Sequence, residues 1–292
     1  MSLSTIANKL LKFAPGLNLD LVKSIIQSSY EELCGRDWSQ LKLQRQITTV
    51  APYSTGTVAV ATDGTVTGSS TVFNSAMVGR FMRVYYDDSL FEIESVTSQT
   101  ELKLKDWTGE VVDADTSYSI LKTIYPVNSD FGLIFDVIYQ TALTKKSQSY
   151  FNRIDPGRTS TGDAPIFWAY AGKNDADAIL IEIYPPVTSA VPLRVYGKMK
   201  AVTLEDDDTP KLPEALVAAH ALIECYAFKA RQQPKQGWEE RQTSQEGQFA
   251  SLLIQYEDED FQLDSHPGRV RDTSSEPLIP SDDNFSLSHD VD

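Results

Sequence analysis

Hydrophobic residues recur every three or four positions near both ends of the chain, and this spacing predicts α-helices there. The N-terminal pattern favours a short helix over residues 3–11 and a longer one over residues 21–33, with Asn18 as its side-chain cap. The longest helix-compatible stretch runs from Leu212 to Tyr256. A proline and a glycine within residues 232–237 divide that stretch into two helices, because both residues interrupt helical backbone.

Between these helices the hydrophobic period shortens to two residues, which indicates β-strands. Residues 41–49 alternate apolar and polar side chains. Between Tyr53 and Thr123, short runs rich in valine and threonine are separated by turn residues, and Asp63-Gly64 is typical of a tight hairpin. Apolar alternation resumes at residues 131–139 and continues in three further strands within residues 165–200. The central half of the chain is therefore predicted to be an antiparallel β region.

These elements predict an α+β fold. We expect the N- and C-terminal helices to form one helical layer packed with the antiparallel β region, and an inserted small β-sandwich or barrel. The predicted core comprises residues 1–52 and 124–262, and the inserted β module comprises residues 53–123. Residues 263–292 are rich in Ser, Asp and Pro, so we expect a flexible acidic arm with no stable core of its own.

The chain is strongly acidic, with 41 acidic and 26 basic residues and a net charge of -15. Residues 257–292 alone carry eleven acidic and two basic side chains. This balance argues against a high-affinity nucleic-acid surface, which needs clustered Lys and Arg, although DNA can pass beside a surface that repels it. No apolar run approaches the roughly 20 residues of a membrane span, and the first residues lack the pattern of a secretion signal.

Residues with catalytic or metal-binding chemistry form no recognisable motif. The sequence contains no nucleophile elbow, phosphate-binding loop or zinc-ligand pair, so we expect neither an enzyme nor a bound cofactor or metal. The paired carboxylates Asp87-Asp88 lie in a polar turn and are expected to be solvated. The acidic run at residues 205–208 lacks the spacing of a calcium loop and is expected to lead into the helix that follows.

Two groups of side chains could contact partners. The aromatic run Phe167–Tyr170 could stack on sugars, but in a strand it is expected to make a core or subunit contact. A polar segment at residues 147–164 is expected to be a loop. Basic side chains on and beside this loop could contact a phosphate backbone or an acidic neighbour, or could simply be solvated. They are Lys145, Lys146, Arg153 and Arg158.

Several segments, taken in order, resemble the head-to-tail adaptor, or connector, proteins of tailed bacteriophages. They are Arg36-Asp37-Trp38 after the N-terminal helix, Asp130–Val137, and the Leu212-Pro213-Glu214 opening of the final helices. Residues 64–80 also resemble a β module common in phage structural proteins. The resemblance covers residues 18–256, and the inserted module makes this chain longer than compact adaptors.

The resemblance implies a structural virion protein made in the host cytoplasm and placed in the neck, at the head-tail interface. Its copies would form a closed ring of about twelve subunits below the portal, which extends the DNA channel and docks tail components. The implied partners are the portal protein, tail or neck proteins, and DNA passing without sequence-specific binding, with no membrane contact. Residues expected to dock on the portal are Glu257, Asp258, Phe261, Leu263, Arg269 and Arg271. Residues expected in the helical layer or between subunits are Trp38, Trp238, Phe249 and Leu253.

Two other functions remain open from the sequence. One is a different neck or tail-ring component, such as a tail-tube or tail-terminator protein, which the same β-rich content could serve. The other is a virion surface protein that binds or degrades glycans through the β insert or the strand containing Phe167–Tyr170.

Overall fold

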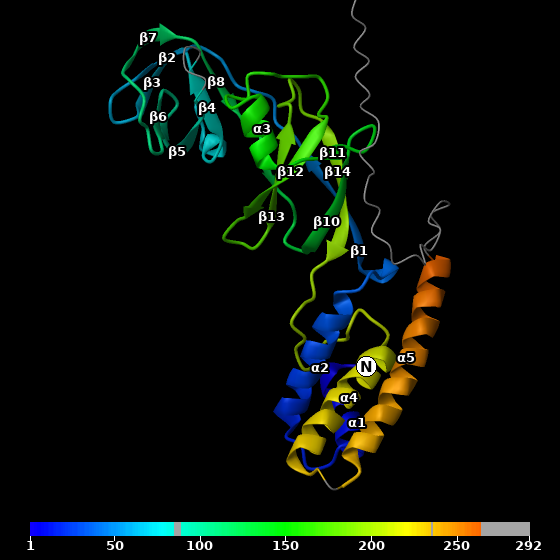
Figure 1. Cartoon of the computed structure of the whole chain (residues 1–292). Helices are drawn as coiled ribbons and strands as arrows, with labels where there is room; N and C mark the ends of the chain where they lie inside the picture. The colour runs from blue at the N-terminus through cyan, green and yellow to red at the C-terminus, as the bar shows by residue number, and fades with distance from the viewer. Residues whose placement is uncertain (85–88, 235, 264–292) are drawn as a thin grey trace, which may run out of the picture.

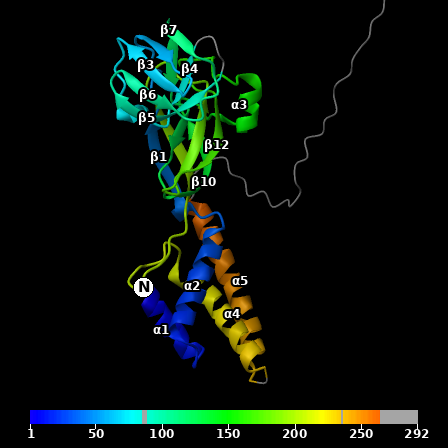
Figure 2. The ribbon, with the colours of Figure 1, turned by 90° about the vertical axis from the view of Figure 1, so that its left-hand side faces the viewer.

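The computed structural model describes residues 1–84, 89–234 and 236–263, which form a helical bundle joined end to end to a β-rich region (Figure 1). The bundle, the central sheets and the inserted module each enclose a separate hydrophobic core. The α+β class with antiparallel sheets is confirmed. The four helices near the chain ends do not cover a sheet face; they lie beyond the end of the central sheets (Figures 1 and 2).

The bundle brings together the first and last described segments of the chain. Its helices are α1 (Leu3–Phe13), α2 (Leu19–Cys34), α4 (Glu214–Gln232) and α5 (Trp238–Leu263). As expected, the Asn18 side chain caps α2 by accepting a hydrogen bond from the Asp20 N–H at 2.9 Å. Fully buried aliphatic side chains from α1, α2 and α4 fill the core, each contributing about 1.5–3 kcal/mol through burial. None of the described helices is long and apolar enough to cross a membrane.

Helix α5 packs along α4 and is buried most deeply at its two ends. Trp238 at its start and Asp260 near its end are buried, whereas the side chains between them are half-buried or exposed. Phe249, Leu252 and Leu253 provide its apolar contacts with the bundle. The helix extends beyond the predicted end at Tyr256 as far as Leu263, and its outer side remains open to solvent.

Two antiparallel sheets enclose the central core. One has the order β1-β14-β10, comprising Lys42–Thr48, Pro192–Met199 and Phe131–Ile138. The other has the order β11-β12-β13-β9, comprising Thr144–Lys145, Phe167–Lys173, Ile179–Tyr184 and Ile124–Pro126, with a parallel pairing only between β11 and β12. Trp168, Ile181 and Val195 are completely buried between them. The aromatic strand expected to make a core or subunit contact thus places Trp168 in this core.

The segment predicted as a loop contains helix α3 (Gln148–Ile154), so the loop prediction for residues 147–164 is wrong there. Ser147 caps the helix, with its side chain accepting a hydrogen bond from the Tyr150 N–H at 3.2 Å. Phe151 packs beneath α3 against Ala169 and Tyr184, on the other side of the second sheet. Because Phe151 is the only buried residue of α3, the helix shows no apolar period.

The inserted module is a seven-stranded, curled antiparallel sheet with the order β7-β2-β3-β6-β5-β4-β8. In that order the strands are Val112–Thr116, Thr57–Val60, Thr65–Ser69, Glu101–Leu104, Phe91–Ser98, Phe81–Val84 and Tyr118–Leu121. The predicted hairpin joins β2 and β3, with Gly64 at φ +81° and Asp63 accepting the Thr65 N–H at 3.0 Å. All residues of the module's buried core lie between Val58 and Ile120, within the predicted insert.

Candidate functional site

The C-terminal end of α5 is fastened to the connection between α2 and β1. Asp260 accepts hydrogen bonds from the Ser39 N–H and hydroxyl, at the start of the 3-10 helix η1 (Ser39–Leu41). Glu257 pairs with Arg36 at 3.1 Å. From the sheet side, the Lys198 ammonium donates to the carbonyls of Gly35 and Arg36 at 2.7 and 2.8 Å, where α2 ends. We refer to Arg36, Ser39, Glu257 and Asp260 as the α5 clasp.

The clasp changes the interpretation of the residues expected to dock on the portal. Glu257 is already engaged within its own subunit, with 35% of its side chain exposed. Asp258 is exposed on the adjoining turn of α5. The side chains of Phe261 and Leu263, and the whole of Arg269 and Arg271, lie outside the described residues. Among the members of this group whose side chains the structure describes, Asp258 is therefore the one that is exposed.

The four residues expected in the helical layer or between subunits face the interior of their own bundle. Trp38 is 1% exposed, and its indole N–H donates to the Leu33 carbonyl at 2.8 Å. Trp238 lies 5.9 Å from the ring of Tyr226, measured between ring centroids. Phe249 and Leu253 are half-buried against the same core. Their assignment to the helical layer agrees with these positions, and Trp38 is too deeply buried to contact a neighbouring subunit.

The four basic residues near the polar segment do not form one surface. Lys145 in the edge strand β11 and Lys146 just after it project in opposite directions: the Lys145 ammonium lies 4.2 Å from the ring centroid of Tyr170, and that of Lys146 lies 5.1 Å from the ring centroid of Tyr150. Arg153 is exposed and lies 5.7 Å from the same Tyr150 ring. Arg158 was expected on the surface but is buried, so it cannot contact DNA or a neighbour from this position.

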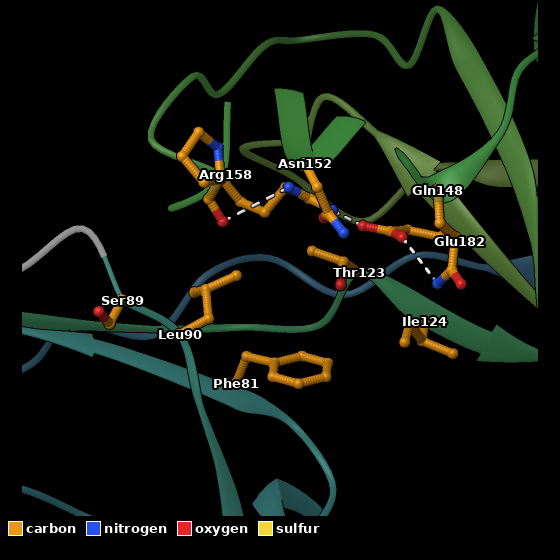
Figure 3. Close-up of a pocket in the computed structure, with 10 residues that line it drawn as sticks. Phe81, Ser89, Leu90, Thr123, Ile124, Gln148, Asn152, Arg158 and Glu182 are labelled. Atoms are coloured by element: carbon orange, nitrogen blue, oxygen red, sulfur yellow. Dashed lines mark hydrogen bonds and ion pairs between the residues drawn. The ribbon is translucent and has the colours of Figure 1, made fainter. Parts of the chain in front are cut away.

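Arg158 instead lines a cleft of about 540 Å³ between the inserted module and the second sheet (Figure 3). The module contributes an apolar wall that includes Phe81 and Leu90. The opposite wall is polar and carries Gln148 and Asn152 from α3 together with Glu182 from β13. Thr123 and Ile124, on the chain that leaves the module, lie between the two walls.

A buried ion pair organises the polar wall. The Nε of Arg158 donates to Glu182 at 2.8 Å, and both side chains are only 5% exposed. The remaining guanidinium nitrogens donate to the Asp155 carbonyl at 2.6 Å and to the Asn152 side-chain oxygen at 2.7 Å. Gln148 donates to the second carboxylate oxygen of Glu182 at 3.1 Å. The two charges therefore neutralise each other, and neutral amide groups satisfy their remaining hydrogen bonds, as buried charges require.

Asp155 fixes the turn that carries Arg158. Its carboxylate accepts hydrogen bonds from the N–H groups of Thr159 and Ser160 and from the Tyr184 hydroxyl. Burial alone would raise the pKa of Asp155, but these hydrogen bonds together outweigh burial and hold the pKa below its ordinary value. A general acid at neutral pH needs a raised carboxyl pKa, so Asp155 is not suited to that role.

The sequence contained only partial signals for this cleft. The turn Asp155-Pro156-Gly157-Arg158 was visible, but the alternation of Glu182 with the isoleucines of β13 did not indicate that Glu182 is buried. In the part of the chain that the structure describes, no group of three His, Cys, Asp or Glu side chains could hold a metal ion. Comparison of the chain with known protein families and with curated protein sequences finds no match.

Proposed function

We propose that this chain is a structural subunit of the neck of a tailed bacteriophage, a head-to-tail adaptor whose copies form a ring below the portal. The observation that carries this proposal is helix α5. It runs for 26 residues, about 39 Å at 1.5 Å per residue, and is fastened to its own subunit at the two ends. Its outer side is thus available along its length to a neighbouring copy.

Two small residues and one exposed apolar residue form a stripe on that outer side, where another helix could pack closely. Gly247, Ser251 and Ile254 are spaced to share one face of α5, and all three are exposed. Nothing lies within 4 Å of the position that a Cβ on Gly247 would occupy, and Ile254 is 58% exposed. We refer to these three residues as the α5 outer stripe. Closed rings form when one face of a subunit meets a different face of the next, and the stripe is a candidate for one of these two faces.

The charge of the chain supports the same proposal. The net charge of -15 disfavours tight binding of DNA, as a channel that must let DNA pass requires. The acidic residues that follow α5 in sequence are proposed to reach the portal, and tail or neck proteins are proposed to dock on the opposite side of the ring. In this proposal the protein is non-enzymatic and acts in the virion.

Native mass spectrometry and negative-stain microscopy of the purified protein, alone and mixed with portal, test the proposal. We expect a ring on the portal; a chain that stays monomeric with portal present would refute the adaptor function. Ile254→Arg should abolish ring formation and leave the circular dichroism unchanged. Ile166→Arg is the matched control, because Ile166 is 55% exposed but lies outside the bundle.

The other two candidate functions predict different results in the same experiment. A tail-tube or tail-terminator protein would form rings that do not bind the portal. A glycan-degrading protein would release sugars from host-surface polysaccharide, and substitution of one acidic residue would abolish that activity.

A further inference from the structure

Arg80 and Lys122 are two cations that flank the paired strands β4 and β8 near the exit from the inserted module. Strands β4 and β8 are antiparallel, and their last pair in this direction is Phe81 with Leu121. Arg80 precedes β4 and Lys122 follows β8, so an extension of the register by one pair would place them opposite each other, and the Arg80 charge acts on Lys122. Both side chains are half-buried. Like charges directly opposite each other in an antiparallel pair are destabilising.

No described residue supplies a counter-charge to this pair. No carboxylate of the described residues forms an ion pair with Arg80 or Lys122. The Nε of Arg80 donates to the Ala76 carbonyl at 3.0 Å, which orients the guanidinium. The Lys122 ammonium lies 5.2 Å from the centroid of the Tyr125 ring. Burial lowers the pKa of Lys122, and the Arg80 charge lowers that pKa further.

Tyr125 provides a rigid and uncharged wall beside the two cations. Its side chain is almost fully buried, and burial raises the pKa of its hydroxyl. The hydroxyl donates to the Lys122 carbonyl at 2.7 Å and accepts from the Val50 N–H at 3.1 Å. Tyr125 therefore cannot neutralise the cations, and the free protein retains their repulsion.

We propose that Arg80 and Lys122 bind one phosphate-type oxyanion. The guanidinium offers a planar fork of N–H donors, and the ammonium offers a compact charge, which together suit a tetrahedral oxyanion. Arg80 lies at the start of β4, and Lys122 lies on the segment that leaves β8 toward strand β9 of the core. A bound oxyanion converts the repulsion into a bridge between the start of β4 and the segment through which the chain leaves the module. This inference does not depend on the adaptor function.

Isothermal titration of the full chain with inorganic phosphate, at constant ionic strength set with chloride, tests the site. We expect one phosphate per chain and at least tenfold weaker binding for Lys122→Gln. Arg153→Gln is the matched control and should bind like the parent, since Arg153 is an exposed arginine outside this site. Absence of phosphate binding by the parent, or equal binding by Lys122→Gln, would overturn the proposal.

Thermal unfolding gives an independent test, because the variant should be at least as stable as the parent without phosphate but should gain less stability with it. Without phosphate and at low ionic strength, Lys122→Gln should be at least as stable as the parent, because it removes the repulsion. With phosphate the parent should gain more in Tm than the variant, since a ligand stabilises the state that binds it. A variant that is less stable without phosphate and gains as much with it would contradict the proposal.

Competition experiments distinguish the source of the oxyanion. If a DNA phosphodiester occupies the site, a short duplex will displace bound phosphate from the parent. If free phosphate is the ligand, the duplex will not compete. Acetate binding as tightly as phosphate would show that a carboxylate is preferred and would overturn the assignment to a phosphate-type ligand.

Discussion

The carboxylate of Asp260 accepts hydrogen bonds from the Ser39 N–H at 2.8 Å and from the Ser39 hydroxyl at 2.5 Å, although the residues are 221 positions apart. Asp260 is 8% exposed, so water is largely excluded from these contacts. The acceptor lies near the end of α5, and the donor opens η1, which leads directly into β1. The contact therefore couples the outermost helix of the bundle to the first strand of the sheet.

Replacing Asp260 by Asn should lower the free energy of unfolding by about 1–2 kcal/mol, because a charged acceptor at a helix N-terminus is lost. Urea unfolding would measure the change. Amide hydrogen exchange should also quicken at the C-terminal end of α5 more than at its start. Glu259→Gln is the control, since Glu259 is exposed and accepts a hydrogen bond from Gln255 on the same helix. Equal effects of the two substitutions would show that the clasp is not a stabilising contact.

Breaking the buried ion pair should have a larger effect. Glu182→Gln leaves the Arg158 charge buried without its partner, and we expect a loss of about 3–5 kcal/mol in urea unfolding. Adding Arg158→Met removes that orphan charge. The double variant should therefore be less destabilised than the sum of the two single variants, with a coupling of about 0.5–3 kcal/mol. Strict additivity would show that the two side chains do not depend on each other.

The stability of the protein should fall in acid partly through Asp155. Its pKa in the folded state lies below the ordinary value of 3.8, so its contribution is fully present above about pH 4. That contribution is lost as the pH falls through the folded pKa. Asp155→Asn should be less stable than the parent at pH 7, and the difference should shrink toward pH 2. Unfolding curves at several pH values, with exposed Asp207→Asn as the control, would measure it; a constant difference would contradict the linkage.

The helices could be predicted from sequence because their signals are local. Apolar spacing and the Asn18 cap lie within the helices themselves or beside them. Helix α3 was missed because Phe151 alone is buried, and one apolar contact produces no period. The end of α5 was also misplaced, since the turns after Tyr256 are acidic, and a buried Asp260 is explained only by its distant partner Ser39.

The cleft was less predictable than the fold for a related reason. Alternation along β13 is typical of a strand with one buried face, but α3 covers the other face, so both sides of the strand are buried. Arg158 was assigned to an exposed loop, and only the folded chain brings it to Glu182, 24 positions away. The signal that could have located this pair is a charged residue within an apolar strand. Such a residue, if buried, needs an opposite charge, and a nearby turn is a place to look for it.

A substitution in the bundle tests whether the helical core is essential to the fold. Leu216 is completely buried in α4, so Leu216→Asp should unfold the bundle by burying an unpaired charge. Circular dichroism and thermal unfolding would report the loss of helix. Ile254→Asp is the control, because Ile254 on α5 is 58% exposed and the new carboxylate remains solvated. A stable Leu216→Asp protein would show that the bundle core is assigned to the wrong side of α4.

The inserted module should be removable without unfolding the rest of the chain. Its buried residues form their own core, and the chain enters and leaves side by side, with Tyr53 and Ile120 exchanging two backbone hydrogen bonds of 2.9 and 2.8 Å. Thr123 must be retained, because its carbonyl accepts the Ile183 N–H at 2.9 Å. Removal of residues 53–122, with Pro52 joined to Thr123 through two glycines, should therefore preserve the central sheets and the bundle.

This excision loses the contact between Arg83 and the Gly157 carbonyl at 3.3 Å, so the turn carrying Arg158 should become somewhat less stable. We nevertheless expect a cooperative thermal transition and helix content close to that of the parent. The isolated segment 53–122 is the matched complement and should fold alone as a β protein, because no residue outside it belongs to its buried core. An excised chain that aggregates or unfolds, while the isolated module folds, would show that the core depends on the module for its stability.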